Sequence, residues 1–437
     1  MNTIWTIIIA GLTFIGISAS ILFFPHIRIK KVKLDTYWLI AIFGAILLVA
    51  TTLCPIEEID ASWTSSNAVN PLKILILFFS MTVLSIYLDE LGLFKFLASV
   101  AVNKAKGHQS VLFFVLYFLV AILTIFTSND IVILTFTPFI CFFCKHAKIK
   151  ALPYLIAEFV AANTWSMMFI IGNPTNIYLA TSAGITFISY LKVMWIPTLV
   201  AGLTELLIVF LLFRKQLKEP ICDDEPEVVH VDSKLDLIVG LIHLLVCLVF
   251  LIISPYIEVE MWLISLICAG SLLLCSLIVR LIRRRGWFYL GDCFKRLPYQ
   301  LIPFILSMSI IVIALNHQGI AELIGDLLNH GSLVFSYGIS SFVFANIINN
   351  IPMSILFSNI PVALTNGEYT QAIYASIIGS NIGAFLTPIG ALAGIMFSNL
   401  LNKYDMHFSF LDFIKYGTIV SVPVLTIALF TLFIVLL

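Results

Sequence analysis

Long apolar stretches separated by short polar loops run through the whole chain, for example residues 4–24, 235–253 and 408–437. Each stretch is long enough to cross a bilayer as a helix, whereas a membrane barrel needs short strands of alternating polarity. We therefore predict an all-α polytopic membrane protein with about ten transmembrane helices. No basic segment precedes residues 4–24 and no small-residue cleavage site follows them, so we expect a retained helix rather than a signal peptide.

Composition agrees with this prediction. Of the 437 residues, 61% are hydrophobic and only 11% are charged, a balance far from that of soluble proteins. The formal net charge is zero, which does not favour a nucleic-acid partner. The eight cysteines are scattered, and the one Cys-x-x-Cys, Cys141 and Cys144, lacks a second pair, so we expect neither disulfides nor a zinc site. The residue usage fits a multi-pass protein of a bacterial cell (inner) membrane.

Basic residues indicate how the first half is oriented, because Lys and Arg in short loops stay in the cytoplasm. Lysines flank the apolar segment near 111–144 on both sides, so both of its ends lie inside. Its roughly 34 residues are short for two full crossings. We predict a re-entrant hairpin that enters from the cytoplasm and has residues 128–130 at its tip. Two ordinary spans joined outside are the alternative.

The second half repeats this order of parts with the opposite orientation. Residues 218–234 contain the only long polar stretch and are predicted to form a cytoplasmic linker between halves 1–217 and 235–437. No Lys or Arg flanks the apolar segment near 332–364, so we predict a second hairpin that enters from the outside. Each half then has three spans, a hairpin, a broken span and a final span, which is an inverted repeat. Chance symmetry is the alternative.

Two polar clusters, 127–130 and 346–352, interrupt the apolar sequence at the hairpin tips, and Gly/Pro-containing breaks follow each of them. Polar side chains at membrane depth are rare unless they face a cavity, a substrate or an ion. Interrupted helices at such a repeat interface offer amides to anions and carbonyls to cations, which indicates a secondary transporter. The candidate binding residues are Ser128, Asn129, Asp130, Gly172, Asn173, Pro174, Thr175, Asn176, Asn349, Asn350, Ser380, Asn381, Thr387, Pro388 and Gly390.

Asp130 is the only charged residue among these candidates. A dehydrated site favours its protonated form and a proton-carrying role, whereas bound sodium favours the ionised form. The candidate sodium ligands are Asn129, Asp130 and Asn173, whose oxygens suit a hard cation. We expect no cofactor other than the coupling ion, sodium or proton. The alternatives are that Asp130 only caps the helix that follows it and that residues 172–174 form a plain loop.

Four further acidic residues have open roles. Glu158 and Glu205 lie inside predicted spans, either on an ion path or, as the favoured interpretation, in helix pairing or snorkelling. Asp89 and Glu90 lie near a helix end and are expected to be solvated. The chain contains no His-Glu-x-x-His, Gly-x-Ser-x-Gly or P-loop motif, so we predict that it is not an enzyme. A channel or a membrane-embedded enzyme is the alternative class.

Several of these motifs resemble the ion transporter superfamily, which includes divalent-anion sodium symporters, arsenite permeases and sodium/proton antiporters. Ser-Asn-Asp at 128–130 is similar to the Ser-Asn-Thr hairpin tip, and 172–176 resembles the loop that interrupts the following helix. Asn-Asn-Ile-Pro at 349–352 resembles the Asn-Asn-x-Pro of arsenite permeases. Residues 379–383 resemble the Gly-x-Asp/Asn-x-Gly stretch of the same permeases, and residues 387–390 resemble their Thr-Pro-Ile-Gly stretch. The Asp at the first tip and the paired Asn at the second depart from the Ser-Asn-Thr tips of plain dicarboxylate symporters.

The resemblance implies ion-coupled transport of a small anion or oxyanion by alternating access, with arsenite or antimonite favoured. Sodium/proton antiport and sodium-coupled di- or tricarboxylate transport are the alternatives. The expected partners are the lipid bilayer, the transported species and a coupling cation. Resemblance to the symporters also allows a homodimer, and resemblance to arsenite permeases allows an ATPase subunit.

Overall fold

The computed structural model describes residues 2–24, 26–29, 32–65, 70–105, 107–221, 233–283, 288–360, 364–404, 406 and 408–437. Almost all of these residues are helical. The elements of the first half are α1 Asn2–Phe23, β1 His26–Ile29, β2 Val32–Asp35, α2 Tyr37–Ala50, α3 Ile56–Thr64, α4 Pro71–Glu90, α5 Leu93–Ala105, α6 Gln109–Phe126, α7 Asn129–His146, α8 Leu152–Trp165, η1 Ile170–Gly172, α9 Pro174–Ser182, α10 Phe187–Phe213 and η2 Gln216–Lys218.

The elements that the structure describes in the second half are all helices. They are α11 Lys234–Ile257, α12 Met261–Arg283, α13 Phe288–Lys295, α14 Leu301–His317, α15 Ile320–Leu328, α16 Leu333–Ile348, α17 Asn350–Phe357, α18 Asn366–Gly383, α19 Leu392–Lys403 and α20 Phe410–Val435. Most of the predicted linker, residues 222–232, lies outside the described residues.

Seven described helices are long and apolar enough to cross a membrane: α1, α4, α6, α10, α11, α12 and α20. An eighth span results if α14 and α15, which meet at 79°, are counted as one broken span. These helices confirm a polytopic helical protein. The predicted number of about ten spans, the re-entrant character of the hairpins and the division into inverted halves remain predictions.

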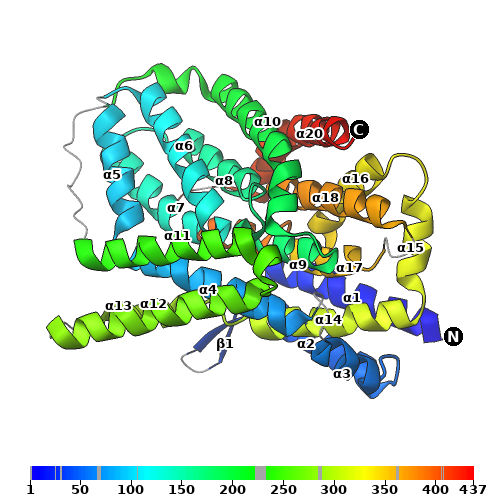
Figure 1. Ribbon diagram of the computed structural model, residues 1–437. Helices are drawn as coiled ribbons and strands as arrows, with labels where there is room; N and C mark the ends of the chain where they lie inside the picture. The colour runs from blue at the N-terminus through cyan, green and yellow to red at the C-terminus, as the bar shows by residue number, and fades with distance from the viewer. Residues whose placement is uncertain are drawn as a thin grey trace.

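Figure 1 shows how the helices are grouped. Helices α1, α2, α4, α12 and α14 lie along one side of the molecule, with α4 against α11, α12 and α13 and with α14 against α2. Helices α5 to α8 form a second group, and α16 packs closely on α18. Helices α10 and α20, the predicted final spans of the two halves, lie against each other, so the fold joins segments that are far apart in the sequence.

One part of the chain departs from the all-α prediction. Strands β1 and β2 pair antiparallel in the first polar loop, with Ile27 opposite Leu34. Apolar and polar residues alternate there with a period of two, which is the pattern of a strand exposed on one face. This alternation is only four residues long in each strand, and our prediction overlooked it.

The chain breaks near the predicted positions, with two corrections. Helix α8 ends at Trp165, several residues before the predicted interruption at 172–176. Helix α18 continues through Gly379, Ser380 and Asn381 and ends at Gly383, so the second break spans 384–391. The helix tolerates Ser380 and Asn381 because their side chains form hydrogen bonds with the 173–176 segment.

Candidate functional site

The first tip is a two-residue break between α6 and α7. Thr127 and Ser128 leave the helical conformation, and α7 begins at Asn129. The Asn129 side chain is buried; its Oδ1 accepts a hydrogen bond from the Asp130 backbone N–H at 2.9 Å, and its Nδ2 donates to Asn163 Oδ1 at 3.2 Å. Asn129 therefore ties the start of α7 to α8.

Asp130 lies in the first turn of α7 and is partly exposed to a cavity of about 260 Å³. Polar or charged residues of that lining include Tyr37, Thr82, Ser128, Asn399, Lys295 and Arg296. No described residue donates a hydrogen bond to the Asp130 carboxylate, and α7 has no side-chain N-cap bond. The alternative that Asp130 only caps α7 therefore finds no support in these contacts.

The first broken helix is held by side-chain amides. Asn173 precedes α9, and its Oδ1 accepts the Thr175 N–H at 3.1 Å, which caps the helix whose first residue is Pro174. Asn176 Nδ2 donates to the Ser166 carbonyl at 2.8 Å. A Cβ on Gly172 would lie 2.3 Å from that same carbonyl, so only glycine fits this approach. Residues 172–174 thus form a packed, hydrogen-bonded segment rather than a plain loop.

Asn381 of α18 joins this segment to the second half. Its Oδ1 accepts from Ser166 Oγ and Asn173 Nδ2, each at 2.9 Å, and its Nδ2 donates to Asn176 Oδ1 at 2.7 Å. Ser380 Oγ donates to Thr175 Oγ1 at 3.3 Å. All of these side chains are buried. The predicted residues of the two broken helices therefore lie together, although more than 200 residues separate them in the chain.

The second tip lies between α16 and α17 at Asn349, whose φ is +73°. Because its ψ is 153°, Asn349 lies outside the left-handed helical region that Asn tolerates and in a region used almost only by glycine, so the backbone is strained here. Asn349 Oδ1 accepts the Ile351 N–H at 3.2 Å and caps α17, while its Nδ2 donates to the Ile389 carbonyl. Asn350 donates its backbone N–H to the Gly390 carbonyl at 3.1 Å. The buried Oδ1 of Asn350 has no partner among the described residues, so it is free to accept from a ligand.

Asn346, which our list of candidates omitted, holds the second break in place. Its Nδ2 donates to the Gly383 carbonyl at 3.0 Å, and its Oδ1 accepts from Thr387 Oγ1 at 2.7 Å. A Cβ on Gly390 would lie 2.6 Å from the Gly383 carbonyl, which explains the glycine. Pro388 contributes no side-chain donor or acceptor. The polar cluster 346–352 already contained the signal for Asn346.

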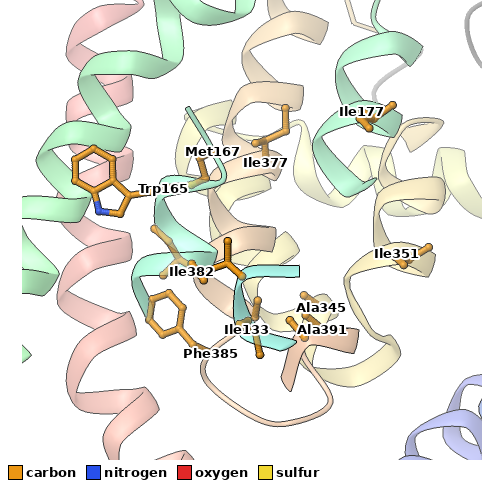
Figure 2. Packing of buried hydrophobic residues seen from close by; sticks show 14 of the residues in the cluster. Ile133, Trp165, Met167, Ile177, Ala345, Ile351, Ile377, Ile382, Phe385 and Ala391 are labelled. Carbon is orange, nitrogen blue, oxygen red and sulfur yellow. The ribbon is translucent and has the colours of Figure 1, made fainter. Parts of the chain in front are cut away.

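The two tips approach the same packed region. Helix α7 packs along α19, which follows the second break. Figure 2 labels Ile133 of α7, Ala345 of α16 and Ala391 immediately before α19, which all belong to one buried hydrophobic cluster. The predicted sodium ligands are used differently: the amide oxygens of Asn129 and Asn173 accept backbone N–H groups, while Asp130 faces the cavity. A sodium site formed by these three residues remains a prediction.

An ion-pair cluster at the rim of the cavity was missed by the sequence analysis. Arg296, between α13 and α14, reaches Asp89 Oδ2 at 2.6 Å and Glu90 Oε1 at 2.5 Å. Thr135 of α7 donates to the same Asp89 oxygen at 2.8 Å. The expectation that Asp89 and Glu90 are solvated is wrong for Asp89, which is buried. Burial lowers the pKa of Arg296, but the two carboxylates raise it by more.

Glu158 and Glu205 are both buried and bonded to neutral groups. Thr137 of α7 donates to Glu158 of α8 at 2.9 Å. Glu205 of α10 accepts from Tyr117 of α6 at 2.6 Å and from Thr164 of α8 at 2.5 Å. Snorkelling is therefore wrong for both residues, and the contacts support the helix-pairing interpretation.

The fold and the paired breaks have the features of a polytopic transporter, and comparison with known proteins agrees. Residues 35–379 match the CitMHS family, described as citrate transporters, and the chain belongs to this family. It is 26% identical to the arsenical pump membrane protein of Escherichia coli K12, over 89% of this chain and 91% of that protein. It is also 26% identical to the arsenical pump membrane protein of Yersinia enterocolitica, over 80% of this chain and 84% of that protein.

A solved structure shares the fold. The YdaH transporter of Alcanivorax borkumensis, reported to have an unusual topology, superposes with a TM-score of 0.56 at 12% identity and covers 99% of this chain and 98% of its own. Together these matches confirm the predicted superfamily, the multi-pass membrane localisation and the class of transporter rather than enzyme. The family implies a small anion or carboxylate substrate.

Proposed function

We propose that this chain is a secondary active transporter that moves a small anion or oxyanion species, with arsenite or antimonite favoured, by alternating access. The observation that carries the proposal is the position of Asp130. Its carboxylate faces the cavity without a hydrogen-bond donor among the described residues, and it directly follows Asn129, the buried amide of the first tip. A carboxylate in this place can hold a proton or a cation and release it when the cavity changes its exposure.

The polar groups around the breaks suit a small hydroxide or oxyanion. They are amides, hydroxyls and backbone groups, which both donate and accept hydrogen bonds. The buried Oδ1 of Asn350 is an acceptor without a hydrogen-bond donor among the described residues. A neutral species such as arsenous acid has hydroxyl groups that can donate to it. The names of two relatives as arsenical pump membrane proteins support the same choice.

Carboxylate transport is the second candidate. The family is described as citrate transporters, and Lys295 and Arg296 lie in the lining of the cavity, where cationic groups favour a carboxylate. Arg296, however, already forms ion pairs with Asp89 and Glu90, and these pairs weaken the attraction of its guanidinium group for a polyanionic substrate. Sodium/proton antiport through Asp130 is the third candidate. The coupling ion, a homodimer and an ATPase subunit remain predictions.

The deciding experiment measures arsenite uptake into everted membrane vesicles under an imposed proton gradient, with sodium and citrate as competitors. We expect saturable uptake by the wild type and its loss in Asp130→Asn, which keeps the size of the side chain but removes its charge. Asp60→Asn, an exposed acid on α3, is the matched control and should transport normally. Uptake of citrate alone, or sodium-dependent proton movement without arsenite flux, would reject the favoured substrate. Full activity in Asp130→Asn would reject the role of this carboxylate.

A further inference from the structure

Glu205 is an enclosed carboxyl group that the proposed transport mechanism does not use. It lies inside α10 with an exposed fraction of 0%. Its Oε1 lies 2.6 Å from the hydroxyl oxygen of Tyr117 on α6, and its Oε2 accepts from Thr164 on α8 at 2.5 Å. Among the described residues, no basic side chain forms an ion pair with it. Neither α11 nor α20, which also pack against α10, contributes a hydrogen bond to Glu205 from its described residues.

The hydroxyl group of Tyr117 has three polar neighbours. Nε1 of Trp165 donates to it at 3.0 Å. The Gly202 carbonyl oxygen and Glu205 Oε1 each lie 2.6 Å from it. A phenol hydroxyl has one hydrogen to donate and two lone pairs that accept. The contact with Glu205, taken alone, is compatible with donation from either side, whereas the Gly202 carbonyl can only accept.

The number of hydrogens decides the direction of the Glu205 contact. If Glu205 were ionised, its carboxylate and the Gly202 carbonyl would compete for the single hydrogen of Tyr117, and one 2.6 Å contact would join two oxygens without a well-aligned hydrogen between them. If Oε1 carries a proton, Glu205 donates to Tyr117, and Tyr117 donates to Gly202. The second lone pair of Tyr117 then accepts from Trp165, and Oε2 still accepts from Thr164. Protonation therefore satisfies every group and avoids an unpaired buried charge.

We propose that Glu205 is a proton-binding site, separate from Asp130, that holds its proton as a neutral carboxylic acid. The bound proton completes the hydrogen bonds that join α6, α8 and α10. Thr164 lies in the last turn of α8, and Ser166, just after that helix, donates to Asn381 of α18 at the first break. Glu205 is therefore a positioning residue that acts through the end of α8. Asp130 differs because it lines the cavity, while Glu205 is fully enclosed.

Infrared difference spectroscopy of the purified full-length protein in detergent at neutral pH, comparing the wild type with Glu205→Gln, tests this proposal. A protonated carboxyl group has a C=O stretching band that an ionised carboxylate lacks. We expect the substitution to remove such a band with the intensity of one carboxyl per chain. Glu57→Gln, the same change at an exposed glutamate of α3, is the matched control and should remove none. Loss of carboxylate bands in Glu205→Gln instead, with no loss of the protonated band, would overturn the proposal.

Unfolding temperatures give a second readout on the same proteins. A glutamine can donate to Tyr117 and accept from Thr164 as the neutral acid does, so Glu205→Gln should unfold like the wild type. Tyr117→Phe should unfold about 2–4 °C earlier, because buried donors of Trp165 and Glu205 lose their acceptor. A Glu205→Gln protein as unstable as Tyr117→Phe would contradict a neutral Glu205. Neither readout depends on the transported species, so failure of the proposed function leaves this test intact.

Discussion

Asn381 uses every hydrogen-bonding atom of its side chain. Its Nδ2 donates to Asn176 Oδ1 and to the Ile377 carbonyl, and its Oδ1 accepts from Ser166 and Asn173. A primary amide offers two donors and two acceptor lone pairs, so the inventory is complete. A residue that is satisfied in this way holds a fixed position and fixes its neighbours. We therefore assign Asn381 a positioning role between the two breaks rather than a mobile contact with the substrate.

Asn381→Ala should destabilise the protein because it leaves buried donors and acceptors of the first break without partners. Each orphaned group costs about 1–3 kcal/mol, and relaxation of the neighbours keeps the total nearer to one such group than to all of them. Unfolding in detergent measures the loss. Asn402→Ala on α19, where the side chain is exposed, is the control and should unfold like the wild type. Equal stability of the two variants would contradict the role of Asn381.

At the scale of whole elements, α16 and α18 are in close contact through their backbones at Gly379. A Cβ on Gly379 would lie 2.0 Å from the Gly338 carbonyl and 2.1 Å from Ser341 Oγ. Small residues allow this kind of backbone contact between membrane helices. The contact sets the position of α18, which carries Ser380 and Asn381, against the helix that leads to the second tip.

Gly379→Ala should force α16 and α18 apart. Overpacking of a filled interface typically costs about 1–3 kcal/mol, and here the first obstacle is backbone that cannot move aside. Thermal unfolding in detergent, followed by circular dichroism, measures the effect. Gly270→Ala on α12 is the matched control, because a Cβ there meets nothing within 4 Å. This control should gain up to about 1 kcal/mol from helix propensity, and a Gly379→Ala protein of wild-type stability would refute the close contact.

At the scale of the whole molecule, the contacts of Arg296 and Asp89 connect α4 and the α13–α14 connection to α7, the helix that carries Asp130. Asp89 Oδ2 forms an ion pair with Arg296, which lies in the α13–α14 connection, and accepts a hydrogen bond from Thr135 of α7. The buried Oδ1 of Asp89 has no partner among the described residues, so Asp89 depends on these contacts for stabilisation of its charge. Three parts of the chain therefore meet at one carboxylate.

Arg296→Gln should weaken this connection and lower the stability by about 1.5–3 kcal/mol, the usual contribution of a hydrogen bond to a charged group, toward the lower end because Arg296 is 31% exposed. A double-mutant cycle with Asp89→Asn should show non-additive losses. Lys295→Gln is the neighbouring control: its pair with Asp292 is largely exposed and should leave unfolding unchanged. Additive losses in the cycle would show that the pair contributes nothing to stability.

The sequence by itself determined the medium, the class of fold and the places where the chain breaks. Apolar length decides which segments can span a bilayer, and the residues that interrupt them, such as Asn173 and Pro174, act on their own backbone through a local helix cap. Such effects depend on neighbours in the sequence, so a pattern can predict them. The tip positions at 128–130 and 349–352 were predicted for this reason.

Only the tertiary structure decided which of these groups meet. Asn381 bonds to residues about 205 positions away, and Arg296 reaches Asp89 from the other half of the chain. A hydrogen bond or ion pair of this kind depends on how helices pack, and packing leaves no local pattern in the sequence. The same reason explains why Asp89 was taken as solvated.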